Sequence, residues 1–260
     1  MKSIRRISAR RWGVVALFLI TLFLNYASNT FLFGEATVGS VSDKYDTLFT
    51  PAGYAFAIWG LIYLTLGGYV FYQAFWASEN QPLCDRLALW LVVNLLANSL
   101  WLPTFLYERI ALSVVFMLII LGTLIQLQIM LTKDRGLPAR ARAWVRVPFS
   151  LYLGWISVAT ITNLAVFVKY SGWQIPDASE SAWVVIMASV GALLAIIVAY
   201  ATRDGLYPLV FVWAYVAIAV ARWDAARSGN DLIVPAVLGW AAVLLVVSGW
   251  QTSRKVKRLV

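Results

Sequence analysis

Eight long apolar runs fill this chain, and nearly all of its charged residues lie between them. A helix needs about 20 apolar residues to cross the ~30 Å hydrocarbon core of a bilayer. Because lipid cannot hydrogen-bond to an exposed backbone, such runs are expected to form helices. The pattern therefore predicts an all-α polytopic membrane protein with eight transmembrane helices, at about 12–33, 54–76, 87–107, 111–132, 145–169, 182–202, 206–223 and 232–251.

The distribution of basic residues predicts the orientation of these helices. A net charge of +9 would suit nucleic-acid binding in a soluble protein, but here the charge is placed between the apolar runs. With the N-terminus inside, 16 of the 21 Lys and Arg residues lie on the cytoplasmic side, as is typical of inserted helices. We therefore expect two cytoplasmic termini, the lipid bilayer of an inner or plasma membrane as the main partner, and no nucleic acid.

The connections between the runs are short. The longest spans 34–53, which leaves no room between the runs for a separate soluble domain. The three residues 108–110 are too few for anything but a tight turn. They predict an antiparallel hairpin of the third and fourth helices.

The chain lacks the residue types on which most enzymes and metal sites depend. It contains no histidine and one cysteine, Cys84, which removes the commonest general base and a thiolate metal cluster. No charged residue lies near the middle of a predicted helix, whereas ion-coupled carriers use buried ionisable groups. We therefore expect no catalytic residue, no metal and no covalently held cofactor.

Amides and aromatic side chains recur within the predicted helices. Asn94 and Asn98 stand four residues apart on the third helix and share a face, with Trp101 close to it. Trp59 and Tyr63 have the same spacing on the second helix. Aromatic walls with a few amides that orient the ligand are typical of small-molecule pockets. These five residues are therefore predicted to line a ligand-binding site.

The fifth helix carries the same mixture. Trp155, Ala159 and Asn163 follow one another at four-residue intervals, so they extend the predicted site. The alternative is that the asparagines only hydrogen-bond to neighbouring helices, because a buried amide in lipid must find a partner. Both interpretations stay open for each asparagine alone, whereas three helices with the same mixture favour a pocket.

Three segments of the chain resemble motifs of one known family. They are TPAGYAFAIWGLIY at 50–63, NLLANSLWLP at 94–103, and YLGW at 152–155 followed by ATITN at 159–163. Their order and spacing are similar to those of the second, third and fifth helices of the tryptophan-rich sensory protein family. That family includes the translocator protein, or peripheral benzodiazepine receptor, and the resemblance covers about residues 12–170.

The resemblance implies a five-helix bundle in 1–170, often dimeric, with a pocket among its helices under the first loop. Members bind tetrapyrroles, and some bind sterols and aromatic drugs. Carried over by motif, the pocket residues would be Trp59, Tyr63, Asn94, Asn98, Trp155 and Ala159. The implied partners are a hydrophobic small molecule, such as a porphyrin or haem, and a second copy in a homodimer. Residues 171–260 would add three transmembrane helices packed on the same bundle.

The chain departs from the family pattern at three points. Ala52 stands where members have the second of two prolines, and Leu151 where they have a proline before the tyrosine at 152. Tyr170 is not followed by the Lys or Arg of the sterol-recognition pattern. The ligand's identity therefore stays open. We expect a ligand-binding sensor, regulator or carrier; the alternative is a small-molecule transporter or exporter not coupled through buried charges, and an enzyme is the least favoured.

Overall fold

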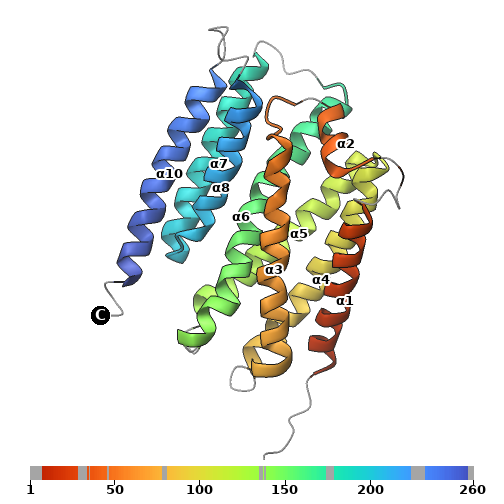
Figure 1. Cartoon of the computed structure of the whole chain (residues 1–260), viewed down its shortest axis with the longest axis vertical. Helices are drawn as coiled ribbons and strands as arrows, with labels where there is room; N and C mark the ends of the chain where they lie inside the picture. The colour runs from red at the N-terminus through yellow and green to blue at the C-terminus, as the bar shows by residue number, and fades with distance from the viewer. Residues whose placement is uncertain are drawn as a thin grey trace, which may run out of the picture. The chain divides into compact units, whose positions relative to one another are not determined.

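The fold is helical throughout the part of the chain that the structure, a computed structural model, describes. That part comprises residues 8–28, 34, 36–45, 47–77, 81–134, 137, 139–173, 179–223 and 232–256. Within these ranges there are helices and turns but no strands, and the long helices are seen in Figure 1. The prediction of an all-α polytopic membrane protein is confirmed, because seven of the described helices are long and apolar enough to cross a membrane.

The seventh apolar run, at 206–223, forms a shorter helix than the sequence predicted. Helix α8 (Leu206–Ala221) has 16 residues and ends at its C-cap, Arg222, although the apolar run extends to residue 223. At a rise of 1.5 Å per residue this helix is about 24 Å long, which is less than the ~30 Å of hydrocarbon. The expectation of eight full-length spans is therefore corrected to seven spans and one shorter apolar helix among the described residues.

The chain folds into two compact units. The first comprises Met1–Val38 and Trp59–Tyr152, and the second comprises Gly39–Ile58 and Leu153–Val260. The chain passes from one unit to the other three times, at the start of α2 (Val38–Lys44), at the start of α3 (Ile58–Phe71) and within α6 (Ala139–Tyr170). The division into a five-helix bundle at 1–170 and three further helices at 171–260 stays a prediction.

The first unit is built around α4. Besides parts of α3 and α6, it contains α1 (Ala9–Ser28), a π-helical turn η2 (Tyr72–Trp76), α4 (Gln81–Leu106) and α5 (Ile110–Lys133). Helix α4 packs against both α1 and α5 (Figure 1). Small residues allow other helices of this unit to approach closely, since an added methyl at Gly68 would lie only 2.8 Å from the Trp144 ring.

The hairpin predicted between the third and fourth helices is confirmed. Helix α4 ends at Leu106 and α5 begins at Ile110. Glu108 adopts the left-handed conformation, with φ of 54°, and the Arg109 amide donates to the Thr104 carbonyl at 2.8 Å. The reversal thus follows from a tight, hydrogen-bonded turn, as the three-residue connection required.

The second unit is built around α8. It contains most of α2 (Val38–Lys44), the 3₁₀ helix η1 (Gly53–Ala57), the C-terminal part of α6, α7 (Glu180–Thr202), α8 and α10 (Ile233–Val256). Helix α8 packs against α7 and α10 (Figure 1). Polar side chains join these helices: the Tyr215 hydroxyl donates to the Ala188 carbonyl, and the Trp240 indole donates to the Ser189 hydroxyl at 2.9 Å.

Candidate ligand-binding site

An aromatic cluster in the first unit joins helices α3, α4 and α6. Trp59 and Tyr63, four residues apart on α3, stack with ring centroids 5.2 Å apart and an interplanar angle of 20°. The Trp59 ring also meets the ring of Tyr152 edge-on at 5.8 Å. The side-chain amide of Asn98 on α4 donates to the Tyr152 hydroxyl at 2.7 Å. Three predicted site residues, Trp59, Tyr63 and Asn98, are therefore brought together, with Tyr152 as the residue that links them.

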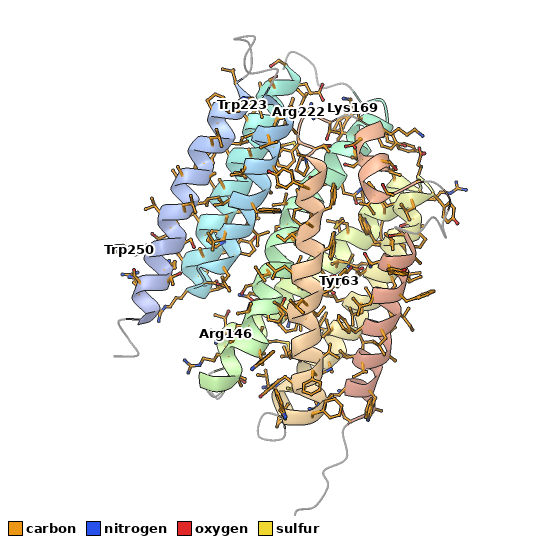
Figure 2. All side chains as sticks on the ribbon, in the orientation of Figure 1. Tyr63, Arg146, Lys169, Arg222, Trp223 and Trp250 are labelled. Carbon is orange, nitrogen blue, oxygen red and sulfur yellow. The ribbon has the colours of Figure 1, made fainter. Side chains whose placement is uncertain are left out.

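The hydroxyl of Tyr63 is the unusual member of this cluster. The hydroxyl oxygen is buried and has no hydrogen-bond partner in the described part of the protein, although the phenol lies near that of Tyr152. Leaving a buried hydroxyl unsatisfied costs about 1–3 kcal/mol. Tyr63 lies midway along α3 in Figure 2. The cluster therefore combines a stacked aromatic pair with a polar atom that a ligand could satisfy.

Asn94 and Trp101 have other neighbours. The Asn94 amide donates to the Ile120 carbonyl at 3.1 Å and to the Thr123 hydroxyl at 2.8 Å, both on α5. Trp101 is buried and stacks on Phe105, one turn further along α4, with ring centroids 5.2 Å apart. For Asn94 these contacts match the packing role weighed in the sequence analysis. A ligand-binding role for either residue stays a prediction.

The three predicted residues on α6 belong to the second unit. Trp155 is only 2% exposed, and Phe56 of η1 meets its ring edge-on at 6.0 Å. Asn163 is buried and Ala159 is half-buried. Between them on the helix, Ser157 shares a hydrogen bond of 2.9 Å with the Tyr207 hydroxyl. Trp155 therefore has its aromatic partner in the segment that precedes α3.

That segment, residues 47–57, is held in place by α8, which the sequence analysis did not foresee. The Ala52 amide donates to the Ala217 carbonyl at 3.1 Å. The indole nitrogen of Trp213 donates to the Ala55 carbonyl at 3.0 Å, and the Trp213 ring packs edge-on against Tyr54 at 5.4 Å. The backbone of the segment thus finds partners on a helix more than 150 residues downstream.

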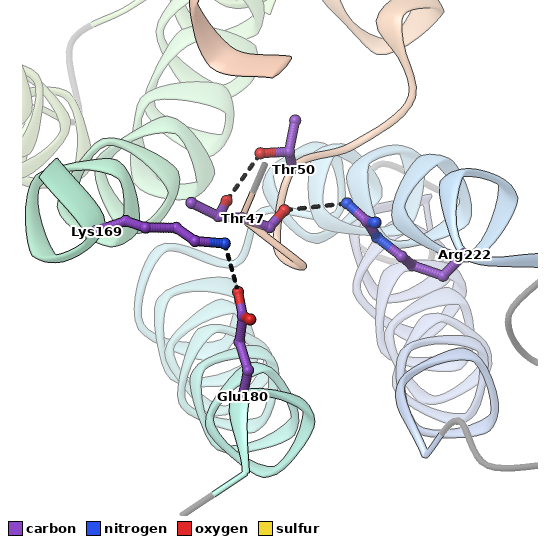
Figure 3. Close-up of polar contacts among 5 residues, drawn as sticks. All are labelled: Thr47, Thr50, Lys169, Glu180 and Arg222. Atoms are coloured by element: carbon purple, nitrogen blue, oxygen red, sulfur yellow. Dashed lines mark hydrogen bonds and ion pairs between the residues drawn. The ribbon is translucent and has the colours of Figure 1, made fainter. Parts of the chain in front are cut away.

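Figure 3 shows how the same segment is fixed at its beginning. The guanidinium of Arg222, the C-cap of α8, donates to the Thr47 carbonyl at 3.0 Å. The hydroxyls of Thr47 and Thr50 hydrogen-bond to each other at 2.8 Å. Nearby, Lys169 and Glu180 form an ion pair of 3.1 Å between α6 and α7. Arg222 lies at the end of an apolar run, which is the only sequence signal that could have drawn attention to it.

The described residues contain no group of three or more His, Cys, Asp or Glu side chains that could hold a metal ion. The polar side-chain atoms around Tyr63, Asn98 and Tyr152 are amides and hydroxyls, and the aromatic rings beside them offer flat apolar surfaces. Such an arrangement can bind a molecule through stacking and a few hydrogen bonds.

Seven bilayer-length apolar helices define an integral multi-pass α-helical membrane protein. A family model described as TSPO-like protein matches residues 11–250, and the chain therefore belongs to the TSPO-like family. This finding confirms the resemblance inferred from the three motifs. The match also includes residues 171–250, which the motifs did not cover, so α7, α8 and most of α10 lie inside the matched region. No curated protein and no solved structure matches the chain.

Proposed function

We propose that the protein binds a hydrophobic planar molecule of the tetrapyrrole type, such as a porphyrin or haem, without covalent attachment and without turnover. It would act as a sensor, regulator or carrier rather than as an enzyme. The observation that carries this proposal is the stacked pair of Trp59 and Tyr63 with an unsatisfied, buried Tyr63 hydroxyl.

The chemistry of the cluster suits such a ligand. Indole and phenol rings stack on extended π-systems, and each aromatic pair adds about 0.5–1.5 kcal/mol beyond area burial. The Tyr63 hydroxyl can donate a hydrogen bond to a ring substituent or carboxylate of the ligand. The bond from Asn98 to Tyr152 holds the Tyr152 phenol in one orientation, so the edge of the cluster is fixed before a ligand arrives.

The test is a titration of the purified, detergent-solubilised protein with protoporphyrin and with haem, followed by absorbance and tryptophan quenching. The 13 tryptophans make the protein a sensitive reporter. We expect saturable binding that weakens about 3–10-fold in Tyr63→Phe, because one hydrogen bond is lost. The unfolding midpoint without ligand should not fall, because that hydroxyl has no protein partner to lose.

A matched control is Tyr26→Phe, since Tyr26 lies exposed on α1. Equal affinities of Tyr63→Phe, Tyr26→Phe and the unaltered protein would contradict the assignment of the site. Absence of saturable binding by the unaltered protein would contradict a tetrapyrrole-type ligand. A further measurement distinguishes a carrier from a sensor. Vesicles reconstituted with the protein should accumulate the bound molecule if the protein is a carrier.

A further inference from the structure

The first turn of α1 contains a buried arginine that forms no ion pair within the described part of the chain. Arg11 is 3% exposed, whereas its neighbour Arg10 is exposed. The Nε atom of Arg11 is buried without a hydrogen-bond partner, and its guanidinium takes part in no ion pair among the described residues. Burying a charge is unfavourable unless an opposite charge and hydrogen bonds compensate it. Among the described residues, the guanidinium therefore lacks the ion-pair partner that would compensate its burial.

The groups around Arg11 are uncharged and mostly able to donate. Gln73 and Tyr69 are both 0% exposed, and the Arg11 guanidinium interacts electrostatically with the Tyr69 hydroxyl and the Cys84 thiol. The Gln73 amide nitrogen makes one long bond of 3.5 Å to the Arg11 backbone carbonyl. The Gln73 side-chain oxygen is buried without a hydrogen-bond partner. The buried Tyr69 hydroxyl has only the Cys84 sulfur, a weak acceptor, beside it. The Arg11 Nε–H is therefore an unused donor, the Gln73 amide keeps a second N–H, and the Tyr69 O–H faces only a weak sulfur acceptor.

Asp85, which follows Cys84 on α4, forms no ion pair with Arg11. It accepts a hydrogen bond of 2.5 Å from the Ser8 hydroxyl. The backbone conformation around Gln73 also favours a binding site. Gln73 belongs to the π-helical turn η2, which packs against α1. Such turns frequently occur at functional sites, where they redirect side chains out of the regular helical register.

We propose that Arg11, Tyr69 and Gln73 form a binding site for a phosphate group. A guanidinium matches the oxygens of a phosphate in a bidentate manner, and a phenol and an amide supply further donors. The site lies at the level of the lipid headgroups, since Arg10 and Trp12 flank Arg11 and both are exposed. The phosphate can come from a phospholipid headgroup or from a free phosphate anion, and both share this recognition chemistry.

The experiment follows thermal unfolding of the full chain in a maltoside detergent, which contains no phosphate. One arm adds inorganic phosphate against chloride at equal ionic strength. The other adds phosphatidylglycerol against a galactolipid, which has similar chains but no phosphate. We expect a saturable rise of the unfolding midpoint in at least one arm. A rise with lipid alone assigns the phosphate to a headgroup, and a rise with inorganic phosphate alone assigns it to a free anion.

Two variants one residue apart separate a built site from diffuse attraction. Arg11→Gln should abolish the phosphate-dependent rise, whereas Arg10→Gln should keep it, although both remove one positive charge. Equal responses of the two variants would overturn the proposal. So would an unaltered protein that responds to neither phosphate nor phospholipid.

Tyr69→Phe provides a second test that does not depend on the folding of Arg11→Gln. The variant keeps the ring that packs against Phe149 at 5.0 Å and removes only a hydroxyl whose neighbour is the weakly accepting Cys84 sulfur. Without phosphate its unfolding midpoint should stay close to that of the unaltered protein, because only a weak O–H···S contact is lost. The phosphate concentration that gives half of the rise should increase about tenfold, as expected for one charge-assisted hydrogen bond. An unchanged half-saturating concentration would overturn the role of this hydroxyl and of the site.

Discussion

The indole nitrogen of Trp213 lies 3.0 Å from the backbone carbonyl of Ala55 and donates a hydrogen bond to it. Two further hydrogen bonds from the same region of the chain, at Ala217 and Arg222, hold the backbone at Ala52 and Thr47. The segment before α3 therefore depends on α8 for its position, and that segment also carries Phe56 against Trp155.

Trp213→Phe should destabilise the protein by about 0.5–1.5 kcal/mol, because Phe fills the space but cannot donate to the Ala55 carbonyl. The measurement is thermal unfolding together with limited proteolysis of residues 47–57, where cleavage should be faster. The control is Trp90→Phe, since Trp90 is an exposed tryptophan of α4. Identical cleavage rates in the two variants would show that the bond does not hold the segment.

Trp155→Ala should lower the free energy of unfolding by about 3–5 kcal/mol, because the indole is buried against Phe56. Loss of ligand binding in this variant would therefore be ambiguous. Trp155→Phe keeps an aromatic ring in the core and should be milder. Comparing porphyrin affinity of Trp155→Phe with its unfolding midpoint separates the two roles. Lower affinity at an unchanged midpoint places Trp155 at the ligand, whereas a lower midpoint alone leaves it only a core residue.

The two asparagines of α4 should respond differently to substitution. Asn94→Ala removes the bonds to the Ile120 carbonyl and the Thr123 hydroxyl, so stability should fall by about 1–3 kcal/mol with porphyrin affinity retained. Asn98→Ala releases the Tyr152 phenol beside Trp59, and affinity should fall as well. Paired unfolding and titration curves measure both effects. Matching losses of affinity in the two variants would refute this distinction.

Gly154→Ala should be destabilising by about 1–3 kcal/mol, because the added methyl would lie 2.8 Å from the Val210 Cβ in a buried position. Gly122→Ala is the matched control within a helix, since nothing lies within 4 Å of its added methyl. That change should be neutral or stabilising by up to about 1 kcal/mol, as expected from helix propensity. Thermal unfolding of both variants gives the comparison, and an equal effect at the two positions would contradict close packing of α8 at Gly154.

The apolar runs predicted which segments cross the membrane but not where the helices begin. Helix α4 begins at Gln81 and α6 at Ala139, each about six residues before the run predicted for it. An apolar run marks the residues that can face lipid. The helix itself can extend past the end of that run, because polar residues also continue its backbone hydrogen bonds. The short helix α2 within residues 34–53 was missed for the related reason that it has no long apolar run.

Spacing along a helix predicted only part of the candidate site. Asn94 and Asn98 share a face approximately, since four residues turn a helix by about 400°, or 40° beyond a full turn. That offset is enough for Asn94 to reach Thr123 on α5 while Asn98 reaches Tyr152 on α6. The contacts of Trp213 and Arg222 with residues 47–57 could not be predicted, because nothing in a single sequence relates positions so far apart.

The hydrogen bond from Trp213 to Ala55 has a consequence for how the protein is made. The two residues are 158 positions apart, and ribosomes add about 5–20 residues per second. Ala55 is therefore synthesised roughly 8–30 s before the tryptophan that will hold its carbonyl. Throughout that interval the nascent chain contains the segment before α3 without its anchors. That segment therefore completes its folding late, and the protein acquires its finished form only when α8 has been inserted.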